Sequence, residues 1–101
     1  MLAIKFKKKK SFVPSESLSA NVQPSVQLAK LADNVVFRCE ITGHPVASVT
    51  WLHNGVPIEN ANGKELVRQN VEMSDGGIYQ CIVKNNVKMV QSTAELRFSG
   101  S

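Results

Sequence analysis

The chain has 101 residues, of which 43% are hydrophobic and 20% are charged, and this suits one folded domain with one core. No stretch approaches the roughly 18 apolar residues that a membrane-spanning helix requires. The net charge of +4 lies entirely in residues 1–20, because residues 21–101 hold seven basic and seven acidic side chains. A domain without net charge is not expected to bind nucleic acid or an acidic substrate by general electrostatic attraction.

Residues 1–20 are predicted to be a basic, disordered tail or sequence added during cloning. The apolar opening is too short for a signal peptide, and its lysines follow the apolar residues instead of preceding them. A lysine run is usually only solvated, with binding to acidic lipid or a polyanion as the alternative. Residues 11–19 are serine-rich and suggest a linker. We therefore place the start of the folded domain at Asn21 and expect removal of residues 1–20 to leave the stability nearly unchanged.

Seven segments have the composition of β-strands and are separated by turn residues. They cover residues 25–30, 35–41, 49–52, 56–58, 65–71, 78–84 and 89–98. Apolar and polar residues alternate most clearly in residues 35–41, as in a half-buried strand. Asn54-Gly55 is a strong hairpin signal, and turn signals recur about every 8–12 residues, which favours an all-β sandwich. No segment has a helical period.

The spacing of a few residues resembles the immunoglobulin superfamily. Trp51 lies 12 positions after Cys39, and residues 75–81 form a D-x-G-x-Y-x-C motif. Within that superfamily, Gly43-x-Pro45 before the tryptophan is similar to the G-x-P-x-P-x-x-x-W stretch of I-set domains, with alanine in place of the second proline.

The residues after the second cysteine also resemble I-set domains. Five of six typical positions fit, namely Val83, Asn85, Ala94, Leu96 and Phe98. Lys88 replaces the glycine at the sixth. The resemblance covers residues 24–98 and implies an all-β, two-sheet immunoglobulin-like (I-set) sandwich over residues 21–98, followed by a linker or cloning remnant at residues 99–101. The stretch of residues 58–66 is too short to hold a full additional strand, so the D strand should be short or missing.

Two stretches resemble a narrower family. Residues 75–81, with paired glycines before the tyrosine, and residues 92–98 are similar to domains of the arthropod Down syndrome cell adhesion molecule (Dscam) family. The short stretch before residue 66 is similar to the fourth immunoglobulin domain of that family. Its members are neuronal and immune surface receptors that bind copies of themselves. The resemblance therefore implies an extracellular adhesion or recognition module.

The resemblance also implies roles for the signature residues. Cys39 and Cys81 would form a disulfide between the sheets; a redox pair, or the free thiols of a cytosolic muscle-type domain, are the alternatives. Trp51 would pack on the bridge, and Tyr79 would form a tyrosine corner. Gly77 would adopt a backbone conformation that a side chain would obstruct. The core signature consists of Trp51, Leu66, Asp75, Gly77, Tyr79 and Leu96.

Three polar residues need a separate explanation. The I-set pattern has an aliphatic residue in place of Arg68, and a buried, unpaired guanidinium would cost several kcal/mol. Arg68 would thus reach water at the sheet margin, pair with a carboxylate, or lie on a bulged strand. His44 and His53 have no cysteine, serine or acid at the spacing of a metal site or catalytic triad. We expect no enzymatic activity, metal, cofactor or small-molecule substrate.

Strand alternation predicts that the outward faces of the two sheets differ. One sheet would expose a largely charged set, namely Val36, Arg38, Glu40 and Glu65. The other would expose three large apolar side chains among uncharged polar ones, namely Thr50, Leu52, Gln80, Ile82, Met89, Gln91 and Thr93. The second composition is expected of an interface core, with scattered exposed apolar residues as the alternative.

Two hypotheses for function follow from the resemblance. In the first, the chain is one immunoglobulin domain of a larger cell-surface receptor or its secreted form, and it binds a second copy or a neighbouring immunoglobulin domain. Such a domain would meet the membrane only through its parent receptor. In the second, it is a structural I-set domain of an intracellular cytoskeletal or muscle protein. The redox state of the two cysteines discriminates between them, because disulfides persist in oxidising compartments.

Overall fold

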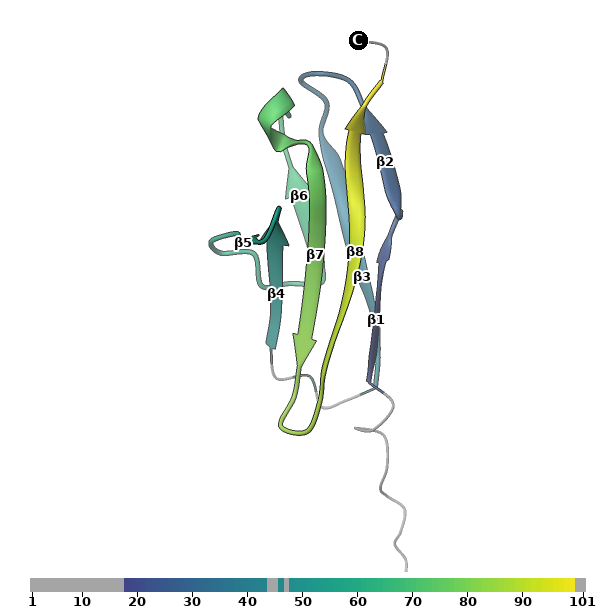
Figure 1. Ribbon diagram of the computed structural model, residues 1–101, viewed down its shortest axis with the longest axis vertical. Coiled ribbons are helices and arrows are strands. Elements are labelled where there is room, and N and C mark those ends of the chain that lie inside the picture. The colour runs from purple at the N-terminus through teal and green to yellow at the C-terminus, as the bar shows by residue number, and fades with distance from the viewer. Residues whose placement is uncertain (1–17, 44–45, 47, 100–101) are drawn as a thin grey trace, which may run out of the picture.

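The computed structural model describes residues 18–43, 46 and 48–99. Within these residues the chain forms two sheets that lie one behind the other (Figure 1). The elements are β1 (Ser19–Gln23), β2 (Val26–Ala29), β3 (Val35–Thr42), β4 (Ser48–His53), β5 (Val56–Pro57), β6 (Glu65–Arg68), the 3-10 turn η3 (Met73–Asp75), β7 (Gly77–Lys84) and β8 (Met89–Phe98). The strand order is β1-β3-β6 in the three-stranded sheet and β2-β8-β7-β4-β5 in the five-stranded sheet. The predicted all-β sandwich is confirmed.

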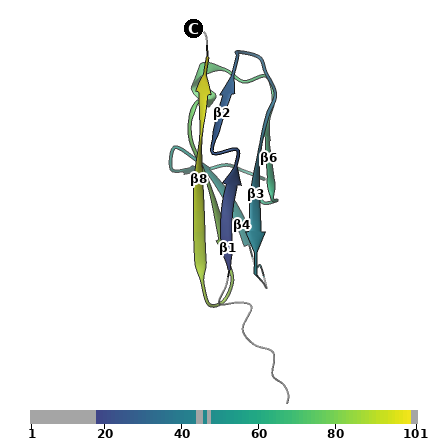
Figure 2. The same ribbon diagram turned by 90° about the vertical axis from the view of Figure 1, so that its right-hand side faces the viewer.

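The first part of the domain differs from the sequence-based expectation. A single first strand was predicted over residues 25–30, but the chain forms two strands on either side of Pro24. β1 pairs antiparallel with β3, and β2 pairs parallel with β8, so the chain changes sheets between them (Figure 2). Proline has no N–H to donate to a ladder, which suits the position where one pairing ends and the next begins.

The folded sequence begins before Asn21, the predicted start. Leu18 is only 2% exposed and belongs to the core, and Ala20 packs against that core. Leu18, Ala20 and Val22 alternate with polar residues, as in a half-buried strand. The serine content of this stretch concealed that alternation. The basic tail of residues 1–17, and residues 100–101, lie outside the described residues.

Deletion of residues 1–20 is therefore expected to destabilise the domain, contrary to the expectation from sequence. Burial of one leucine side chain contributes about 2 kcal/mol, which corresponds to a fall of about 10 °C in melting temperature for a domain of this size. The control is deletion of residues 1–17, which retains Leu18 and all of β1. Calorimetry should separate the two truncations, and equal melting temperatures would show that Leu18 and the first two residues of β1 contribute nothing to stability.

The remaining strands follow the predicted order. β6 ends at Arg68, three residues before the predicted end, and Asn70 then adopts a left-handed conformation with φ 53°. Val71 leaves the sheet and exchanges backbone hydrogen bonds with the turn after β2. No strand lies between β5 and β6, a stretch described throughout, in agreement with the predicted short or missing D strand.

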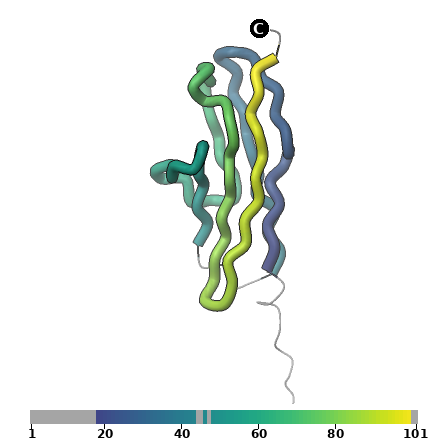
Figure 3. The backbone as a smooth tube through the Cα atoms, viewed as in Figure 1, coloured from purple at the N-terminus to yellow at the C-terminus, as the bar shows by residue number. Residues whose placement is uncertain are grey.

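The core lies between the sheets and contains the inward residues of both. Its largest fully buried side chains are those of Trp51, Tyr79, Phe37 and Leu96. The described chain begins at the end of the sandwich that carries the β7–β8 hairpin, and it ends at the opposite end (Figure 3). The sheets therefore present two broad outward faces, one on each side of the sandwich.

Candidate functional site

The two cysteines hold the sheets together. Cys39 on β3 and Cys81 on β7 form a disulfide with a Cα–Cα distance of 6.4 Å. Both residues are at most 1% exposed. The predicted bridge is confirmed, and the described residues include no free cysteine.

Trp51 lies beside this bridge, because it is the cross-strand partner of Cys81. The indole is fully buried, and its Nε1–H donates to the carbonyl of Gly63 at 2.8 Å. This bond satisfies the buried donor and ties down the loop that replaces the D strand. Sequence reasoning placed the tryptophan in the core but gave no partner for the indole. Leu66 and Leu96 are also buried in the core.

Tyr79 makes the hydrogen bond of a tyrosine corner. Its hydroxyl donates to the carbonyl of Asp75 at 2.5 Å, and the Asp75 carboxylate accepts the backbone N–H of Glu72 at 2.7 Å. Arg68 pairs with Asp75 at 3.4 Å and lies 5.8 Å from the centre of the tyrosine ring. Of the three environments expected for Arg68, the structure therefore shows the one in which it pairs with a carboxylate.

Burial raises the pKa of Tyr79 above its ordinary value of 10.0, and the charge of Arg68 opposes this in part. Because this is the single tyrosine of the chain, ultraviolet titration follows it alone. The folded protein should ionise at higher pH than the urea-unfolded chain. The unfolded state then loses its proton first, so stability is full below about pH 10 and falls as the pH rises through the folded pKa. Coincident titration curves would contradict this burial.

Asn54 and His53 connect the β4–β5 turn to the start of β7. The Asn54 side-chain oxygen accepts the Ile78 N–H at 2.9 Å, and the His53 ring stacks on Tyr79 with centroids 4.4 Å apart. His53 Nε2 lies 2.8 Å from the carbonyl of Gly76. His53 is therefore a structural residue, whereas His44 lies outside the described residues. Across the described ranges, no three His, Cys, Asp or Glu side chains gather as metal ligands, and no helix could span a bilayer.

The seven residues of the predicted interaction face all lie on the outer side of the five-stranded sheet. Strand register sets them in rows. Thr50, Ile82 and Gln91 form one row across β4, β7 and β8, and Leu52, Gln80 and Thr93 form the next. Met89 is opposite Lys84 in the row beyond. We call this surface, made of Thr50, Leu52, Gln80, Ile82, Met89, Gln91 and Thr93, the CFG face.

The centre of the CFG face carries no charge. The Gln80 amide donates to the Gln91 side-chain oxygen, so these two polar groups already satisfy one another in part. Lys84 lies at one border, and an ion pair of Glu95 and Arg97 with a 3.1 Å N–O distance lies beyond the other. Uncharged cores with charged rims are typical of protein interfaces.

Further exposed apolar side chains lie on the same outer side of the five-stranded sheet, next to the Glu95–Arg97 border. Ile78 on β7 is 45% exposed, and Val26 and Leu28 on β2 are exposed beside β8. The alternation of Val26 and Leu28 is visible in the sequence, but their place beside Glu95 and Arg97, at the border of the CFG face, depends on the parallel pairing of β2 with β8. The opposite sheet carries an Arg38–Glu65 ion pair with an N–O distance of 2.5 Å.

Comparison with known proteins agrees with the fold. Residues 17–85 match the sequence model described as immunoglobulin domain. The cell adhesion molecule Dscam1 of Drosophila melanogaster is 33% identical over 84 residues, which cover 82% of this chain and 4% of that protein. Neogenin of Rattus norvegicus is 36% identical over 90 residues, which cover 83% of this chain and 6% of that protein.

A solved relative agrees in three dimensions. The crystal structure of Dscam1 isoform 4.44, N-terminal four Ig domains, matches with a TM-score of 0.78 at 33% identity. The match covers 81% of this chain and 21% of that one, so the present chain spans a small part of its relatives. The family match and the adhesion-molecule relatives agree with the prediction of a non-enzymatic domain. This chain belongs to the immunoglobulin domain family.

Proposed function

We propose that this domain is a recognition module of a larger cell-surface adhesion protein and that it contacts another protein through the CFG face. The observation that carries this proposal is the uncharged centre of that face between charged borders. Removing uncharged side chains from water costs less than removing charged ones, so such a surface can be buried against a partner at low cost. The similarity to the cell adhesion molecule Dscam1 supports the same class of function.

The Cys39–Cys81 disulfide supports an extracellular location over the intracellular, cytoskeletal alternative. Disulfides persist in oxidising compartments and are rare in the cytosol. The partner that suits this surface is a second copy of the chain or a neighbouring immunoglobulin domain. Either partner would bury the same apolar residues.

Substitution Ile82→Glu tests the proposal, because it places a carboxylate at the centre of the CFG face. The matched control is Val67→Glu, since Val67 is 51% exposed on a strand of the opposite sheet. Sedimentation velocity at increasing protein concentration measures self-association. We expect the parent and Val67→Glu proteins to associate and Ile82→Glu to remain monomeric, with a loss of at least tenfold in affinity.

Equal association of Ile82→Glu and the parent would exclude the CFG face as the contact surface. A parent protein that stays monomeric at about 1 mM, where even an interaction of about 4 kcal/mol is half-saturated, would exclude the second copy as its partner. A neighbouring domain would then be the remaining candidate. Circular dichroism of both variants would establish that each is folded.

A further inference from the structure

In the three-stranded sheet, β3 extends further than its neighbour β6. β6 pairs with β3 over Val35–Arg38, and one further bond runs from the Cys39 N–H to the carbonyl of Lys64 at 2.7 Å. β3 continues to Thr42, and there its partner within the described residues is β1, on the other side. The end of β3 therefore has an open edge where a D strand would otherwise lie.

The backbone of Ile41 faces this open edge. In an antiparallel sheet, the N–H and C=O groups of alternate residues point to the same side of a strand. Because Cys39 donates toward the β6 side, Ile41, two residues later, presents its N–H and C=O in the same direction. Among the described residues no strand pairs with it there. A free strand edge is a template for pairing with another extended segment.

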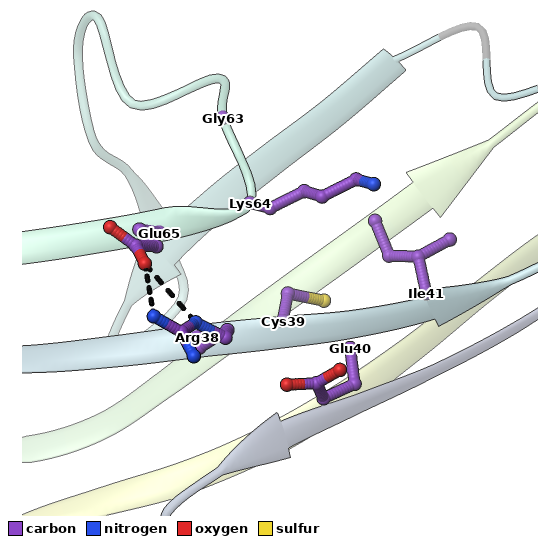
Figure 4. A pocket seen from close by; sticks show the side chains of 7 residues that line it. All are labelled: Arg38, Cys39, Glu40, Ile41, Gly63, Lys64 and Glu65. Carbon is purple, nitrogen blue, oxygen red and sulfur yellow. Dashed lines mark hydrogen bonds and ion pairs between the residues drawn. The ribbon is translucent and has the colours of Figure 1, made fainter.

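A shallow groove lies along this edge (Figure 4). It runs between β3 at residues 38–41 and the chain at residues 63–65. Ile41 packs partly against the core, and the Lys64 side chain extends along the groove toward it. The groove thus combines a backbone edge, the apolar side chain of Ile41 and the ammonium group of Lys64. The Glu40 carboxylate lines it from the β1 side of β3, and the Arg38–Glu65 ion pair lies at its end.

The charges around the groove leave Lys64 without an ion-pair partner in the described part of the chain. Glu65 is engaged by Arg38, which donates to it from Nε at 3.1 Å and from Nη2 at 2.5 Å. Among the residues that the structure describes, no carboxylate lies within ion-pair distance of Lys64. A carboxylate on an incoming segment would complement this charge.

We propose that the open edge of β3 binds an extended peptide strand of a partner protein, which supplies an apolar side chain beside Ile41 and a carboxylate for Lys64. The strand would add to the sheet by backbone hydrogen bonds, as in other cases of β-strand addition. This site lies on the opposite sheet from the CFG face and is independent of the function proposed for that face. A second copy is a poorer fit, because two-fold pairing of the same edges would direct two Lys64 side chains toward one another.

Hydrogen exchange of the Ile41 amide tests whether the edge is open. In the full chain this amide should exchange at least tenfold faster than that of Cys39, whose N–H is bonded. Protection of Ile41 in the full chain would overturn the proposal. If that protection disappears on deletion of residues 1–17, the tail occupies the edge; if it grows with protein concentration, a second copy does.

Titration with a synthetic peptide tests the occupant. The probe is the acetylated, amidated pentapeptide threonine-valine-threonine-glutamate-threonine, in which the valine and the glutamate lie on one face of an extended strand. Binding is followed by the shift of the Ile41 amide in ¹⁵N–¹H spectra. Replacing its glutamate by lysine should weaken binding about threefold, as expected for one exposed ion pair, and N-methylation of its backbone should abolish binding. In Lys64→Glu protein the preference for glutamate over lysine in the peptide should reverse. The control Lys30→Glu makes the same charge change directly after β2, away from the groove, and should leave that preference unchanged.

No shift of Ile41 up to about 10 mM peptide, a concentration that would detect even millimolar affinity, would contradict the proposal. So would shifts confined to the five-stranded sheet, or equal binding of the N-methylated peptide. None of these results bears on the CFG face, which the Ile82→Glu experiment tests separately.

Discussion

Removal of the disulfide is expected to lower the free energy of unfolding by about 4 kcal/mol in the chain-entropy model, because the bridge closes a long loop. The two cysteines are 42 residues apart in the sequence. The double variant Cys39→Ala/Cys81→Ala also loses two buried sulfur atoms. Since small domains are stable by only about 5–15 kcal/mol, this variant should be close to unfolded at 37 °C. Urea unfolding followed by tryptophan fluorescence measures the loss.

Two controls separate the bridge from simple loss of packing. Reduction of the parent protein should produce most of the same destabilisation without changing a side chain. Thiol titration of unreduced protein in denaturant should find no reactive cysteine. Two titratable thiols, or a loss below about 1 kcal/mol on reduction, would mean that the bridge does not form or does not stabilise the domain. That result would also favour the intracellular alternative.

Substitution Gly77→Ala should destabilise the domain by about 3 kcal/mol, through backbone strain together with loss of a hydrogen bond. Gly77 has φ 122°, a conformation that side chains rarely adopt. A Cβ atom there would lie 2.4 Å from the side-chain oxygen of Asn54. Asn54 would have to move, and its side-chain oxygen would then lose the hydrogen bond that it accepts from the Ile78 N–H.

The adjacent glycine provides the matched control. Gly76 has φ −68°, and a Cβ atom there would lie 3.3 Å from a ring carbon of Phe98, which can shift slightly. Gly76→Ala should therefore cost less than about 1 kcal/mol. Both variants can be compared by chemical denaturation. Equal losses at the two positions would contradict the role assigned to Gly77 and its contact with Asn54.

The sequence predicted the strands with strong local patterns. Residues 35–41 alternate clearly, and the structure has β3 over Val35–Thr42. The last strand, Met89–Phe98, has the predicted bounds. The first strand was missed because the serine content of residues 11–19 suggests a linker and conceals the alternation of Leu18, Ala20 and Val22. Its pairing with β3 is also a long-range contact that local composition does not encode. The partner of Arg68 was left open for the same reason, since Asp75 lies on a separate turn.

In the candidate site, too, some features follow from local sequence patterns and others depend on contacts between distant segments. Alternation alone was enough to assign Ile82 and Gln91 to an outward face, because side chains in a strand alternate with a period of two. The contribution of Leu28 depends on β2 joining the five-stranded sheet, and the open edge at Ile41 depends on where β6 stops. Both are properties of strand register, which is set by contacts between distant segments.

If the CFG face is the contact surface, cross-saturation in NMR should detect it at individual amides. Deuterated, ¹⁵N-labelled protein is mixed with unlabelled copies at a concentration where they associate, and the unlabelled protein is irradiated. We expect signal loss at the amides of Thr50, Ile82 and Gln91, and none at Arg38 or Val67 on the opposite sheet. Signal loss centred on Arg38 and Val67, or spread evenly over both sheets, would contradict this expectation.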